Sequence, residues 1–106
     1  MVDRREERHM YALALVRYRR PLEEVLEHLE AHRTYLRDLK KKGLVLASGA
    51  LDPRHGGAIL LRVPDDAAQA SLDRIRDDDP FVRASVAQYE VWPWLPSIGK
   101  EDLDRL

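Results

Sequence analysis

The sequence lacks cysteine, lacks a long apolar run and lacks an excess of charge of one sign. Without cysteine there is neither a disulfide framework nor thiol chemistry. No apolar run approaches the ~20 residues of a membrane span, so we expect no membrane partner. The net charge of -1 leaves no broad positive field for nucleic acid. The start, MVDRREERHM, is too charged for a secretory signal, and a cytoplasmic location is expected.

The composition is that of one small globular domain. The chain has 106 residues, of which 44% are hydrophobic and 35% charged. That length supports one modest core, and that mixture is too apolar for a disordered chain. We expect a flexible lead-in over residues 1–8, a folded domain over residues 9–94 and a tail over residues 95–106, with one helical turn near Leu103.

Apolar periodicity predicts four strands and two helices. Strands are expected over residues 9–18, 44–50, 58–63 and 82–92, the middle two forming a hairpin through LDPRHGG. One long helix is expected from Pro21 to Gly43, with the glycine as a left-handed cap. A second helix follows Pro64, capped by Asp65 or Asp66, and ends before Pro80. Pro93 is expected to end the last strand.

The order β-α-β-β-α-β predicts an α+β, ferredoxin-like fold, in which two helices cover one face of an antiparallel four-stranded sheet. The first and third strands are nevertheless apolar on both faces. An uncovered apolar face of that size is unusual in a soluble monomer. We therefore predict a homodimer in which sheet packs on sheet. The alternative is that the C-terminal tail covers these residues.

One polar residue lies on the apolar side of the predicted long helix. His32 falls inside the apolar stripe formed by Leu22, Val25, Leu29, Leu36 and Leu39. A titratable ring that faces a core needs a polar partner. Asp79 ends the second helix, which packs on the same sheet face, so its carboxylate can lie near the middle of the first helix. There it would accept a proton from one imidazole nitrogen and leave the other free for general acid–base chemistry.

The same spacing also fits a buried histidine that merely bridges two helices. From spacing alone this structural interpretation is favoured, because most buried polar groups are hydrogen-bonded for structural reasons. Asp77 and Asp78, which precede Asp79, are expected to be solvated and to stop the helix.

Four arginines are candidates for binding an anionic substrate. Arg33 falls within the apolar arc of the first helix and can either reach a pocket mouth or extend into solvent. Arg19, Arg20 and Arg54 lie in loops or at element ends, where simple solvation is the commoner outcome.

Two further functions are weighed and set aside. His28 and His32 are four residues apart, a spacing that can place two metal ligands on one helix face. Zinc needs at least three positioned protein ligands, and no third is fixed by the sequence, so no metal is predicted. An RNA-binding module of the same plan stacks bases on aromatic residues of its central strands, and the third strand, AILLRV, has none.

Several motifs, in this order and spacing, resemble the YciI-like (YCII-related) family over about residues 9–94. They are H-x-x-Y-L from His32, then Gly43, LASG at residues 46–49, Gly57, D-P-F at residues 79–81 and the Pro93-Trp94 ending. The resemblance implies a ferredoxin-like fold that dimerises as an α+β barrel. It also implies an active site built from the helix histidine and the D-P-F aspartate, here His32 and Asp79. The extra histidine, His28, and the long polar tail depart from the family pattern.

With this resemblance, the catalytic interpretation of His32 and Asp79 is favoured over the structural one. We expect a small enzyme without a cofactor that carries out proton transfer, elimination or isomerisation on a small organic molecule, since a dehydrochlorinating branch is among the family's proposed activities. Arg33 and Phe81 are the candidate substrate-binding residues. The alternative is a non-catalytic module of the same fold that binds a small ligand or a partner.

Overall fold

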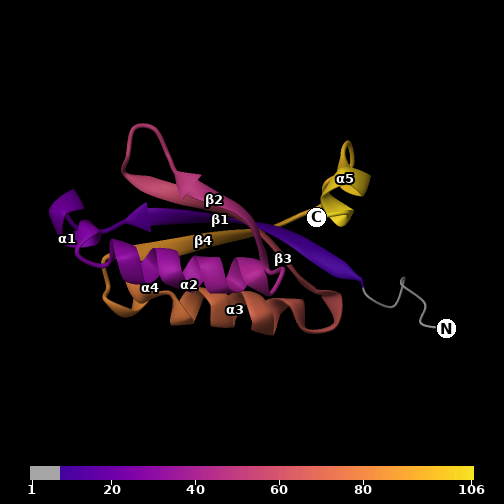
Figure 1. Cartoon of the computed structure of the whole chain (residues 1–106), viewed down its shortest axis with the longest axis horizontal. Helices are drawn as coiled ribbons and strands as arrows, with labels where there is room; N and C mark the ends of the chain where they lie inside the picture. Colours follow the sequence, from indigo (N-terminus) through magenta and orange to yellow (C-terminus); the bar gives the residue numbers. More distant parts are fainter. Residues whose placement is uncertain (1–7) are drawn as a thin grey trace.

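The computed structural model describes residues 8–106, in which four strands alternate with helices (Figure 1). The predicted flexible lead-in lies outside the described residues except for Arg8. The elements are β1 (His9–Tyr18), α1 (Leu22–Leu26), α2 (Leu29–Lys41), β2 (Val45–Ala50), β3 (Gly56–Pro64), the 3-10 turn η2 (Asp65–Ala67), α3 (Ala68–Asp78), α4 (Pro80–Arg83), β4 (Ala87–Trp94) and α5 (Lys100–Asp104).

The strands form one antiparallel sheet in the order β2-β3-β1-β4. β1 is central because its residues are apolar on both faces, as predicted, and it pairs with β3 and β4 along its length. A bulge between Val45 and Ala47 shifts the register of edge strand β2. The predicted α+β, ferredoxin-like fold is confirmed.

Helices α2 and α3 lie side by side on one face of the sheet (Figure 1). The buried face of β1 contributes Ala12, Ala14 and Val16, and β3 contributes Ile59, Leu61 and Val63. These residues pack against apolar side chains of the two helices, among them Leu36, Leu39, Leu72 and Ile75. This face of β1 presents small side chains, Ala12 and Ala14, to the helical layer.

The predicted long helix is interrupted, which is a correction. The amides of Glu27 and His28 bond to carbonyls three residues back, and α2 restarts with the amide of His32 on the carbonyl of His28. The break lets Val25 be fully buried while Leu22 and Leu26 remain about 40% exposed. α1 lies beyond the end of β1 (Figure 1), and Val25 is its one buried residue.

The fourth strand starts later than predicted. Residues 80–83 form the short helix α4, because Asp79 caps it with its side chain and Pro80 occupies its first turn. Ser85 takes a left-handed conformation, with φ of 60°, and β4 begins at Ala87. The strand also runs past Pro93 to Trp94. β4 is an edge strand, so the missing proline N–H removes no ladder hydrogen bond.

Two predicted caps have different outcomes. Gly43 takes the expected left-handed conformation, with φ of +80°, after α2. Asp65 and Asp66 do not cap the second long helix. They lie in the 3-10 turn η2, and α3 starts at Ala68 without a side-chain cap.

Among residues 8–106, the other face of the sheet is covered at one end. There α5 lies on the side opposite α2 and α3 (Figure 1), and its turn lies where one was predicted. Tyr11 donates to Asp104 at 2.5 Å, and Arg62 donates to the carbonyls of Leu103 and Leu106. Leu13 and Trp92, opposite each other on β1 and β4, remain 36% and 55% exposed. No helix within residues 8–106 has the length and apolarity required to cross a bilayer.

Candidate functional site

The structure brings His32 and Asp79 together. His32 projects from α2 toward the core with only 12% of its side chain exposed, and its Nδ1 lies 2.9 Å from Asp79 Oδ1. An ionised carboxylate only accepts hydrogen bonds, so Nδ1–H is the donor in this pair. This tautomer leaves Nε2 as an acceptor. The two residues, 47 positions apart, meet because α2 and α3 pack side by side on the sheet.

Asp79 is the only charged residue among those fully or nearly fully buried in the described part of the chain, with 0% exposure. Its extended backbone, with φ of -65° and ψ of 127°, ends α3 before Pro80, as the proline predicts. Its Oδ1 also accepts from the amide of Phe81 at 2.8 Å, and its Oδ2 accepts from the hydroxyl of Tyr89. Three donors from three elements therefore satisfy a carboxylate that would otherwise be costly to bury.

The ring of Phe81 packs face to face against the imidazole of His32. The two ring centroids lie 3.9 Å apart, and Phe81 also packs edge-on against the ring of Tyr18. The side chain is 1% exposed and belongs to the hydrophobic core. Phe81 borders the cavity beside His32, but most of its surface packs against protein.

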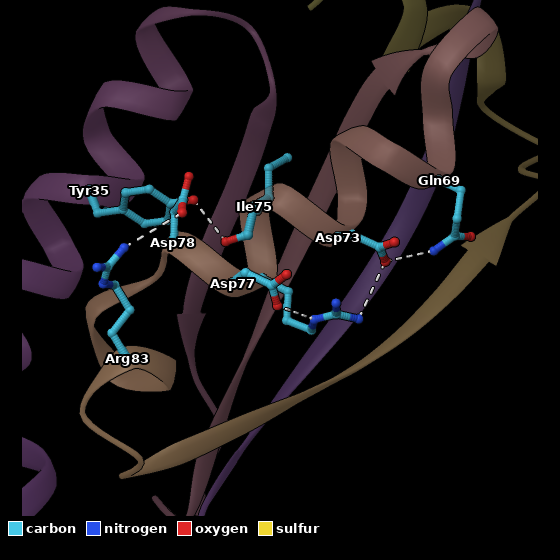
Figure 2. A network of polar contacts seen from close by, with 8 residues as sticks. Tyr35, Gln69, Asp73, Ile75, Asp77, Asp78 and Arg83 are labelled. Atoms are coloured by element: carbon cyan, nitrogen blue, oxygen red, sulfur yellow. Dashed lines mark hydrogen bonds and ion pairs between the residues drawn. The ribbon is translucent and has the colours of Figure 1, made fainter.

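Two tyrosines of the site were not predicted. Tyr89 lies on β4, and burial, followed by the charge and the hydrogen bond of Asp79, raises the pKa of its phenol far above the ordinary value. Tyr35, three residues after His32, donates to the carbonyl of Ile75 at 2.7 Å and so ties α2 to α3 (Figure 2). Burial and the charges of Asp78 and Asp79 raise the pKa of Tyr35 as well. The H-x-x-Y-L motif contains Tyr35, so its sequence signal was present.

The two acids that precede Asp79 are exposed to solvent, as predicted. Asp77 bonds to Arg76 at 2.8 Å, and Asp78 lies 3.8 Å from Arg83 (Figure 2). Only the third member of the acidic run, Asp79, turns into the core.

A cavity of about 710 Å³ opens beside His32, between α2 and the β2–β3 hairpin. Within residues 8–106, Nε2 of His32 has no hydrogen-bond partner, and it is not among the buried unpaired atoms. A basic nitrogen thus meets a space of the size that small-molecule sites occupy. The arrangement is chemically able to take a proton from a bound molecule and return it.

Basic side chains surround this cavity. Arg33, predicted from the sequence, borders it and makes one long ion pair with Glu30 at 3.7 Å. Arg54, weighed as a loop candidate, borders it too, whereas Arg19 and Arg20 do not. Sequence reasoning missed three more basic residues at the cavity wall: Arg37, Lys40 and Lys41.

His28 stands apart from His32. It occupies the position before α2 and does not border the cavity. No three side chains of His, Cys, Asp or Glu in the described part of the chain lie close enough together to hold a metal ion.

Comparison with protein families gives one match that spans most of the chain. The family described as YCII-related domain matches residues 10–95. The chain belongs to this family. The match begins with β1 and ends after β4, so it contains both His32 and Asp79. A search of curated proteins found no match.

A solved structure has the same fold. It is 5-chloro-2-hydroxyhydroquinone dehydrochlorinase from Burkholderia phenoliruptrix AC1100, in complex with 2,5-dihydroxybenzoquinone. The TM-score is 0.63 at 20% identity, over 82% of this chain and 96% of that one. At this identity the likeness establishes the shared α+β fold.

Proposed function

We propose that this YCII-related protein is a small enzyme that uses no cofactor and has His32 as its general acid–base. The reaction class is proton transfer, elimination or isomerisation on a small organic molecule. One observation carries the proposal: Nδ1 of His32 bonds to a buried carboxylate, while Nε2 lies beside a cavity and has no partner among the residues that the structure describes. A histidine with a purely structural role does not need a ring nitrogen that is left free to face a cavity.

In this proposal each neighbour has a role. Asp79 fixes the tautomer and stabilises the imidazolium that forms when Nε2 takes a proton. Phe81 and the hydroxyl of Tyr89 hold the ring and the carboxylate in position. In an elimination, Nε2 removes a proton from carbon, the C–H electrons form a double bond and the leaving group departs as an anion. The proton on Nε2 then passes to solvent, which restores the free base.

The relatives support the reaction class. The structural neighbour is named a dehydrochlorinase, and it holds a small hydroxylated quinone. Both the shared family and the shared fold are consistent with small-molecule chemistry in this chain. Hydroxylated aromatic compounds and their quinones are therefore the first compounds to test.

We also propose that the protein is a homodimer through the open sheet face. Leu13, Leu60 and Trp92 form a row across β3, β1 and β4 that α5 leaves uncovered. An exposed apolar row next to an ordered tail is typical of an interaction surface.

The proposed function is tested by a thermal-shift screen followed by product analysis. The screen compares wild type with His32→Ala on hydroxylated aromatics and quinones, with 2,5-dihydroxybenzoquinone included, and hits are incubated and followed by NMR. Wild type should be stabilised by a ligand class and convert a member of it, while His32→Ala should not convert it. His28→Ala, on the same stretch but away from the cavity, should behave as wild type. Equal turnover by His32→Ala would overturn the proposal, and binding without any turnover would favour a ligand-binding module.

A further inference from the structure

The charged side chains around the cavity are of one sign. Of residues 8–106, five basic side chains border it, and no aspartate or glutamate does. The chain as a whole has 18 basic and 19 acidic residues, so this segregation does not follow from composition. The basic residues are Arg33, Arg37, Lys40, Lys41 and Arg54.

Most of these cations have no acidic partner in the part of the chain that the structure describes. Arg33 has only the 3.7 Å contact with Glu30, whose side chain is 80% exposed. The other four make no ion pair with any residue from 8 to 106. By contrast, arginines on α3 and α4 do pair with nearby acids, such as Arg76 with Asp77 and Arg83 with Asp78.

Helix stability does not explain the arrangement. Arg33, Arg37 and Lys41 follow at intervals of four, where like charges repel on a helix surface. The helix dipole favours positive charge only in the last turn, at Lys40 and Lys41. It accounts for neither Arg33 in the first half of α2 nor Arg54, which comes from the β2–β3 loop. An anion in the cavity would relieve the repulsion on α2 and engage the loop residue.

The cations stand beside the proposed base. Arg33 follows His32 directly, and the row from Arg33 to Lys41 runs along α2 for roughly 12 Å, at 1.5 Å per residue. Ser48 on β2, which carries a neutral hydroxyl, also borders the cavity. A bound molecule with one acidic group would leave most of the positive charges in this row without a negative counterpart.

We propose that the cavity selects a small organic anion with two or more acidic groups, held by the basic side chains that surround it. This inference rests on the proposed function for its choice of site and names the class of substrate. Positive charge around the site also raises the rate at which such anions enter.

The test uses three aromatic probes with one ring and increasing negative charge. Calorimetry measures the dissociation constants of benzamide, benzoate and terephthalate, which carry no, one and two negative charges at neutral pH. Terephthalate should bind at least about tenfold more tightly than benzamide, and its binding should weaken as salt rises from about 0.02 M to about 0.2 M. Arg37→Gln and Lys41→Gln should each weaken terephthalate binding up to about fivefold. Lys42→Gln, the next lysine on the same helix end but outside the cavity wall, should have no effect.

Equal affinity for the three probes, or equal loss in Lys42→Gln and Lys41→Gln, would overturn the inference. His32→Gln separates it from the proposed function. If that variant keeps the charge ranking while no anionic compound is ever converted by wild type, the proposed catalysis fails and the charge selection stands. If wild type converts a neutral compound through His32 and shows no charge ranking, the charge selection fails and the catalysis stands.

Discussion

The imidazole of His32 and the ring of Phe81 lie face to face, 3.9 Å apart and inclined by only 5°. Asp79, two residues before Phe81, bonds to the edge of the same imidazole and to the amide of Phe81. One short segment, D-P-F, therefore controls both the plane and the rotation of the histidine ring. The site depends on α4 starting at Pro80, and the capping carboxylate is also the partner of the proposed base.

Asp79→Ala should destabilise the protein by about 3 kcal/mol or more. It removes a helix cap and leaves His32 and the hydroxyl of Tyr89 without their acceptor, and each of these losses costs about 1–2 kcal/mol. Urea unfolding measures the change in free energy. Asp77→Ala, which removes an exposed acid paired with Arg76, should change stability by less than about 0.5 kcal/mol. Equal effects of the two variants would show that the buried network contributes little.

Phe81→Ala should cost about 3–5 kcal/mol, because the ring is 1% exposed and nothing else fills its place beneath His32. Val82, the next residue, is half-buried, and Val82→Ala is the matched control. It should lower the free energy of unfolding by less than Phe81→Ala does. Thermal or urea unfolding measures both. A Phe81→Ala protein as stable as Val82→Ala would mean that the stacking seen here does not contribute to the core.

Stability should fall with pH above about 10, and Tyr89→Phe should weaken this dependence. Burial and Asp79 raise the folded-state pKa of Tyr89 above its ordinary value of 10.0, so the unfolded chain loses the phenolic proton first. Stability from this group is complete below pH 10 and is lost as pH rises. One such tyrosine contributes about 1.4 kcal/mol per pH unit to the slope. Unfolding free energies from pH 9 to 11 measure it, and equal slopes in both proteins would contradict the assignment.

Trp92→Lys should convert the proposed homodimer to a monomer without changing the helical layer. Trp92 is 55% exposed on the open sheet face, where a charge would have to be buried against the partner. Sedimentation analysis gives the mass, and circular dichroism checks the fold. Gln88→Lys, an exposed position on the same face of β4 at its other end, is a milder comparison. A wild-type protein that sediments as a monomer at all concentrations would exclude the dimer.

The order of elements, the central strand and the His32–Asp79 contact follow from local patterns. Strand periodicity places β1, Pro80 ends α3, and the misplaced polar residue in an apolar stripe identifies His32. These signals work because they depend on residues close in sequence. The resemblance to the YCII-related family pointed to the same two residues.

The features that were missed depend on packing between distant elements. The break between α1 and α2 falls inside a continuous apolar stripe, so the periodicity of the sequence cannot reveal it. Tyr89 bonds to Asp79 across the layer between β4 and α3, and no spacing rule links them. Lys40 and Lys41 look like ordinary residues of a helix C-terminus until the β2–β3 hairpin closes a cavity beside them.

Solvent exchange gives the most direct test of His32 as a proton-transfer residue. Compounds that stabilise wild type in the screen, and that carry an acidic C–H, are incubated with enzyme in D2O and followed by proton NMR. Wild type and His28→Gln should exchange that hydrogen for deuterium at the same rate. His32→Gln should lower the rate by at least about a hundredfold, the contribution typical of a general base. Exchange by His32→Gln at the wild-type rate would contradict the role assigned to His32.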